Sequence, residues 1–132
     1  MSGLKTLFCG LAFIWAGPTW SDTVSQRAQN FATCAGRFSA LVEFERLFDG
    51  AASEQAEIER ELFVALLEAT LPDATDLGVS GRVALAWRIE AKMAQAQLLT
   101  RGAFDQNKDV AEFSRRQSAH FLSVCRMLAL GV

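Results

Sequence analysis

The sequence predicts an all-α fold, an antiparallel up-down-up-down four-helix bundle in which one disulfide joins the first helix to the last. Three observations support this prediction. Apolar residues recur at spacings of three and four along most of the chain. No stretch alternates apolar and polar residues for long enough to indicate a strand. Cys34 and Cys125 lie on apolar faces near opposite ends of the helical part of the chain.

The composition is that of one globular domain. The chain has 132 residues, of which 51% are hydrophobic and 21% are charged. Its formal net charge is -2, so it has no overall basic field to attract polyanions. We therefore expect no nucleic-acid binding.

Residues 1–21 have the pattern of a signal peptide. Lys5 precedes an apolar run of about 12 residues, and Pro18 and small residues follow it. This predicts cleavage after Ser21, with residues 22–132 forming a single four-helix domain that has no stable membrane span after processing. The run is shorter than the roughly 20 residues that cross a bilayer, which makes a retained anchor the less favoured alternative.

The first helix is predicted from the capping residues Asp22 and Thr23 to Asp49, because Gly50 then interrupts the pattern. One face of this helix is apolar and carries Phe31, Cys34, Phe38, Leu41, Phe44 and Phe48. Beside that face, small residues recur every four positions at Ala32, Gly36 and Ala40. Such a row predicts the close approach of a neighbouring helix.

Three more helices follow. The second is predicted from the cap Ser53 to Pro72, since proline cannot continue the hydrogen-bond ladder. The third begins after Asp76 or Ser80, ends near Thr100 and uses Trp87 as core bulk. The fourth covers residues 106–130.

A disulfide between Cys34 and Cys125 is predicted because thiols of exported proteins are usually paired. Two separate buried thiols are the alternative. Neither cysteine belongs to a Cys-x-x-Cys pair, so the bond is interpreted as structural. In an antiparallel bundle this bond would place Glu43 opposite Arg116 and Glu45 near Arg115.

The segments CAGRFSA at 34–40 and RIEAK at 88–92 are the basis of a resemblance to other proteins. In these segments the chain resembles uncharacterised small exported helical proteins of alphaproteobacteria. The resemblance implies a periplasmic or secreted location. It implies no activity and no site residues.

No catalytic or cofactor motif is complete in this sequence, because each one lacks a required residue or element. Cys125 is followed by Arg126 and not by a haem-attachment motif, and a single histidine is too few for a di-iron or zinc site. Residues 105–109 begin like a calcium loop, but Arg116 stands where its final acid belongs. Ser80 lacks the strand of a nucleophile elbow. We therefore predict that the protein has no cofactor and is not an enzyme.

One polar cluster is proposed from the expected pairing of the third and fourth helices. It would bring Glu90 near His120, with Arg37 and Arg88 about a turn away. The alternative is that these side chains are solvated on helix flanks. If the cluster is buried, it would fix the helix register or bind a ligand.

For function, the sequence favours an exported, non-enzymatic interaction or accessory protein that contacts an unknown protein partner through a helical face. The alternative is a carrier that holds a small apolar ligand between its helices.

Overall fold

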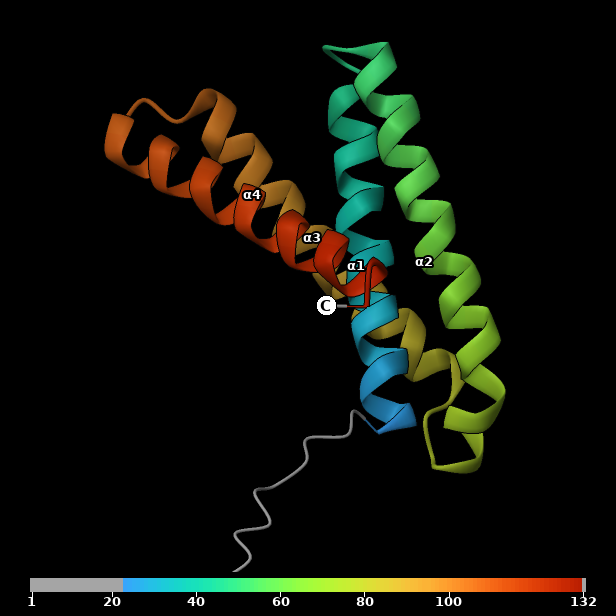
Figure 1. Cartoon of the computed structure of the whole chain (residues 1–132). Coiled ribbons are helices and arrows are strands. Elements are labelled where there is room, and N and C mark those ends of the chain that lie inside the picture. Colours follow the sequence, from blue (N-terminus) through green and yellow to red (C-terminus); the bar gives the residue numbers. More distant parts are fainter. Residues whose placement is uncertain (1–22, 132) are drawn as a thin grey trace, which may run out of the picture.

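The computed structural model describes residues 23–131 and contains four helices (Figure 1). They are α1 (Val24–Glu45), α2 (Gly50–Asp76), α3 (Gly81–Phe104) and α4 (Lys108–Ala129). No strand occurs within this range, so the predicted all-α fold class is confirmed. The predicted signal peptide, residues 1–21, lies outside the described residues.

A polar side chain caps the start of every helix. Thr23 and Ser80 each accept a hydrogen bond from the backbone three residues on, as the sequence predicts for α1 and α3. The prediction for α2 was wrong, because its cap is Asp49 and Ser53 lies inside the helix. α1 ends at Glu45, earlier than expected, and a turn at residues 46–48 leads to the extended backbone of Asp49. Asn107 caps α4.

The prediction that α2 ends at Pro72 was also wrong, because the helix continues to Asp76. Proline leaves one backbone acceptor without its usual partner, but the following turn carries the fully buried Ala74, and this packing offsets the loss. The actual stop is Gly78, whose φ of 94° is readily adopted only by glycine. There the N–H of Val79 donates back to the carbonyl of Ala74 at 2.9 Å, which closes the helix end.

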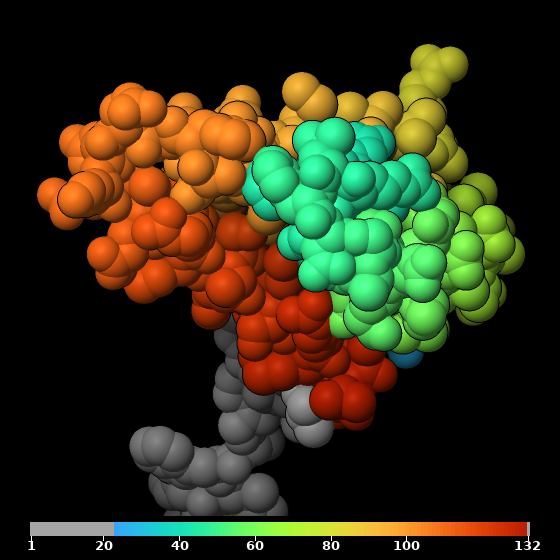
Figure 2. All heavy atoms as spheres, turned by 90° about the horizontal axis from the view of Figure 1, so that it is seen from above, coloured from blue at the N-terminus to red at the C-terminus, as the bar shows by residue number. Residues whose placement is uncertain are grey.

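The chain is arranged as two helical hairpins, α1–α2 and α3–α4, and α1 is the helix through which they pack together (Figure 1). α1 packs against α2 and α3, and α3 packs against α4. The α3–α4 hairpin is inclined to the α1–α2 hairpin, and the two hairpins diverge towards their far ends in Figure 1. Seen from above in Figure 2, the C-terminal half of α4, in red, lies against the green α2.

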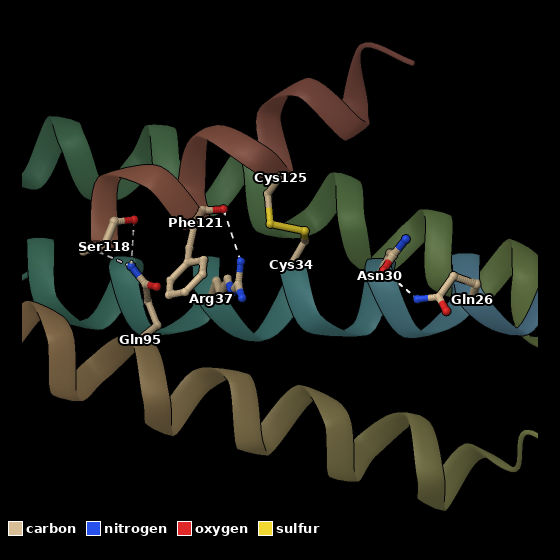
Figure 3. Close-up of a disulfide and its surroundings, with 8 residues drawn as sticks. All are labelled: Gln26, Asn30, Cys34, Arg37, Gln95, Ser118, Phe121 and Cys125. Carbon is tan, nitrogen blue, oxygen red and sulfur yellow. Dashed lines mark hydrogen bonds between the residues drawn. A yellow bond between two sulfur atoms is a disulfide. The ribbon is translucent and has the colours of Figure 1, made fainter. Parts of the chain in front are cut away.

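The disulfide between Cys34 and Cys125 is present, with the Cα atoms 5.6 Å apart (Figure 3). Both cysteines are buried in a core cluster with Phe38 and Phe63, whose rings stack at 5.7 Å. Leu122 of α4 completes this contact. The bond therefore joins α1 to α4 inside the core, where both helices also meet α2.

The close approach predicted at Gly36 is confirmed, and the neighbouring helix is α3. A Cβ atom at Gly36 would lie 2.1 Å from the carbonyl oxygen of Arg88, so only glycine fits at this crossing. Trp87 packs beside the crossing but remains half-buried at the edge of a core that includes Ala28 and Ala32. The side chain therefore fills less of the interior than predicted.

The predicted facing of α1 and α4 does not produce ion pairs in residues 23–131. Glu43 pairs with Lys92 of α3 at 2.6 Å, and no ion pair joins Glu43 or Glu45 to Arg115 or Arg116, although Glu45 and Arg115 line the same hollow. The physical reason is the glycine crossing, which brings α3 against α1. α4 follows α3 and meets α1 mainly around the disulfide.

Candidate functional site

The four residues of the predicted polar cluster do not form one site. Arg37 and Glu90 line the same shallow hollow of about 240 Å³, whereas Arg88 lines a different hollow between α1, α2 and α3. The ring of His120 lies against that of Phe121, at 5.8 Å between centroids. Within residues 23–131, no hydrogen bond or ion pair joins any two of the four.

Arg37 has a structural role that the sequence did not indicate. Its Nη1 donates to the backbone carbonyl of Phe121 at 3.3 Å, and its guanidinium lies 4.1 Å from the centre of that ring (Figure 3). Burial lowers the pKa of Arg37, because the charged form loses hydration. The side chain thus ties α1 to α4 one turn from the disulfide.

An open groove lies between the C-terminal half of α1 and the α3–α4 hairpin. Its volume is about 490 Å³. It exists because the hairpin is inclined away from α1 (Figure 1). Side chains of three helices line this α1/α3/α4 groove: Leu41, Phe44, Glu45, Leu99, Gly102, Ala103, Arg115, Ser118, Ala119, Leu122 and Arg126.

The groove walls are mainly apolar, and two arginines are held in place at their edges. Arg115 donates from Nη1 to the carbonyl of Gly102 at 2.7 Å. Arg126 reaches from α4 to Glu59 of α2 with hydrogen bonds of 2.6 and 3.0 Å. This bond to Glu59 raises the pKa of Arg126, and partial burial opposes the change. Both guanidiniums retain N–H groups that are free of these bonds.

Ser118 is a polar group in the groove wall. Its Oγ accepts a hydrogen bond of 2.7 Å from the Nε2 of Gln95, a side chain that is only 1% exposed (Figure 3). The hydroxyl proton of Ser118 is not used in that bond, so it can donate to an acceptor in the groove. The Oε1 of Gln95 is buried and has no partner in the described part of the chain.

Aromatic rings stand at the far end of the groove, where the two hairpins diverge. Phe48 lies 4.9 Å from Phe44 and 6.1 Å from Phe104, measured between ring centroids. Phe48 and Phe104 remain 58% and 59% exposed. Exposed aromatic side chains beside an apolar groove are typical of surfaces that bind other molecules.

The residues considered for catalysis and metal binding have structural positions. Ser80 caps α3, and Asn107, from the segment that begins like a calcium loop, caps α4. Residues 23–131 contain no group of three His, Cys, Asp or Glu side chains arranged to hold a metal ion. In the same range, none of the four helices is both long enough and apolar enough to cross a bilayer.

The sequence did not reveal the groove. Leu41 and Phe44 were assigned to the buried face of the first helix, and Leu122 was not singled out. A period of three and four marks an apolar face, but it does not distinguish a face covered by a neighbouring helix from one that lines an open groove. The inclination of the hairpins decides between them.

Comparison of this chain with protein-family models, with curated proteins and with solved structures gives no match.

Proposed function

We propose that this protein is an exported, non-enzymatic binding protein that holds an amphipathic helix of a partner protein in the α1/α3/α4 groove. The observation that carries the proposal is the groove itself, which is open along three helices and has apolar walls. An apolar groove between helices is a recurring way to bind the apolar face of another helix.

Charge complementarity specifies the partner further. Arg126 is paired with Glu59, so Arg115 and the Ser118 hydroxyl are the principal donors that remain for a partner at the groove. An acidic side chain beside the apolar face of the partner helix would match these donors. The exposed rings of Phe48 and Phe104 would add apolar contact at the far end.

We propose a periplasmic or secreted location for the same protein. The Cys34–Cys125 bond supports it, because such bonds persist in oxidising compartments. The signal-peptide pattern of residues 1–21 and the resemblance to exported alphaproteobacterial proteins point the same way.

A carrier of a small apolar ligand is the second candidate, and the groove volume favours it. A volume of about 490 Å³ falls within the range of small-molecule pockets. Such pockets bury most of the ligand surface, whereas this groove is open along its length. We therefore place the partner helix first.

The experiment compares substitutions at two exposed alanines, one inside the groove and one outside it. Ala119 lies in the groove and Ala69 lies on α2 outside it. Ala119→Glu would fill the groove and introduce a charge that repels an acidic partner, and Ala69→Glu is the matched control. Wild-type protein carrying a photo-crosslinking residue at Phe44 is exposed to its own periplasm, and the adducts are identified by mass spectrometry.

We expect one adduct that wild-type protein and Ala69→Glu form and that Ala119→Glu loses. The adduct peptide should be an amphipathic helix with an acidic residue. Identical adducts from all three proteins would contradict the groove as the binding site. A small apolar compound extracted from native protein, and lost in Ala119→Glu alone, would support the carrier.

A further inference from the structure

A second hollow lies between α1, α2 and α3 and differs from the groove in its charge. It has a volume of about 220 Å³ and is lined by four cationic side chains, Arg46, Arg60, Arg88 and Lys92, with Glu43 as the single acid. These cations come from α2, from α3 and from the residue that follows α1, so only the folded chain brings them together. The whole protein, in contrast, has a net negative charge.

The carboxylates around the hollow do not neutralise it. Lys92 pairs with Glu43 at 2.6 Å, and Glu57 is shared by Arg46 and Arg60 at 3.0 and 2.8 Å. Glu61 also approaches Arg60, at 3.8 Å. Four cations and three carboxylates leave an excess of one positive charge at the hollow.

Two donors at the hollow lack an acceptor. Arg88 lines the hollow and forms no ion pair or side-chain hydrogen bond among residues 23–131, which makes it the donor open to a ligand. In the same range the Nε of Arg60 has no partner, but this atom is itself buried. A buried N–H without an acceptor is costly, and native structures usually satisfy such groups with protein, water or a ligand. Both donors belong to guanidinium groups, whose planar fork suits an oxyanion.

The backbone that carries two of the cations is held at the close crossing of α1 and α3 at Gly36. A Cβ atom at Gly36 would lie 2.1 Å from the Arg88 carbonyl oxygen and 3.0 Å from the Lys92 nitrogen. Arg88 and Lys92 are four residues apart and share one face of α3. Their positions relative to α1 are therefore set by packing before any anion binds.

We propose that this hollow is a binding site for the phosphate group of a small phosphate monoester with an apolar substituent. A phosphate monoester presents three acceptor oxygens and a charge of about -1.5 to -2 near neutral pH, so it can bond to several of these cations at once, whereas a carboxylate has two oxygens and one charge. Leu85 and Ile89 also line the hollow and are 54% and 53% exposed. They provide apolar contact for the substituent where it leaves the site.

Lipid headgroups are a second source of phosphate, and in phosphatidylglycerol the group is a diester with a single negative charge. The net charge of -2 opposes adsorption of the whole protein to an anionic surface, so the free ester is favoured. The two sources are separable by experiment.

The test is a titration of the folded, disulfide-bonded protein with inorganic phosphate and with hexyl phosphate, followed by amide chemical shifts at constant ionic strength. We expect shifts on α3 around residues 85–92, and tighter binding of hexyl phosphate than of inorganic phosphate. Arg88→Gln should weaken binding about ten- to a hundredfold, since it removes charge-assisted hydrogen bonds. The control is Arg101→Gln, because Arg101 lies on the same helix outside the hollow.

The variant Glu43→Gln tests whether binding depends on the charge of the hollow. A damaged fold would weaken phosphate binding, whereas loss of this acid should strengthen it. This change removes an acid that competes for Lys92, so phosphate should bind several times more tightly than to wild-type protein. Vesicles with and without phosphatidylglycerol identify the source: binding that requires this lipid and Arg88 would assign the site to a headgroup. Absence of saturable shifts, or equal affinities for Arg88→Gln and Arg101→Gln, would overturn the proposal.

Discussion

Replacing Gly36 by alanine should destabilise the fold more than any other single methyl group added at a glycine of residues 23–131. The new Cβ would lie 2.1 Å from the Arg88 carbonyl oxygen and 3.0 Å from the Lys92 nitrogen. Both of these atoms belong to the α3 backbone, so no flexible side chain can move aside. α1 and α3 must separate by about 1 Å to restore van der Waals contact.

The expected magnitude follows from two opposing effects. Overpacking a tight core typically costs about 1 to 3 kcal/mol or more, and a backbone clash belongs at the upper end of this range. Alanine gains up to about 1 kcal/mol over glycine inside a helix. The net loss in the free energy of unfolding is therefore about 2 kcal/mol, which lowers Tm by about 10 °C for a domain of this size.

Thermal unfolding followed by circular dichroism measures this effect, and other glycines provide graded controls. Gly81→Ala places its Cβ in open space at the start of α3, so Tm should stay the same or rise slightly. Gly102→Ala meets the Arg115 Cγ at 2.9 Å, but that side chain can move, so its loss should lie between the other two. A Gly36→Ala protein as stable as Gly81→Ala would refute the tight crossing.

The remaining predictions concern the disulfide, the aromatic core and the leader. Replacing Cys34 and Cys125 together by alanine should cost about 4 to 5 kcal/mol in the chain-entropy picture, because the bond spans 91 residues, and urea unfolding measures this; an unchanged midpoint would contradict it. Phe63→Ala should cost about 3 to 5 kcal/mol by the same assay, because the ring is buried against Phe38, whereas the exposed control Phe113→Ala should cost much less. Intact-mass analysis of the exported protein should show cleavage near Ser21, and retention of residues 1–17 would refute the signal-peptide prediction.

The sequence by itself determined the helical class, the number of helices and the disulfide. Each of these depends on local patterns or on residue chemistry. A period of three and four identifies a helix wherever it occurs, and Thr23 and Ser80 cap through bonds to residues only three positions away. Cys34 and Cys125 were the only cysteines expected to remain after processing, so their pairing needed no knowledge of packing angles.

Only the tertiary structure decided how the helices cross and what lies between them. The small-residue row at Gly36 predicted a close neighbour, but the periodicity could not say that this neighbour is α3. The packing of α3 on α1 pairs Glu43 with Lys92 instead of Arg116, and it places Arg88 at a hollow that His120 does not line. It also opens the groove and gathers four cations at one hollow. The physical reason is that a crossing angle depends on how two surfaces fit over several turns, and side-chain spacing along one helix does not contain the shape of the other.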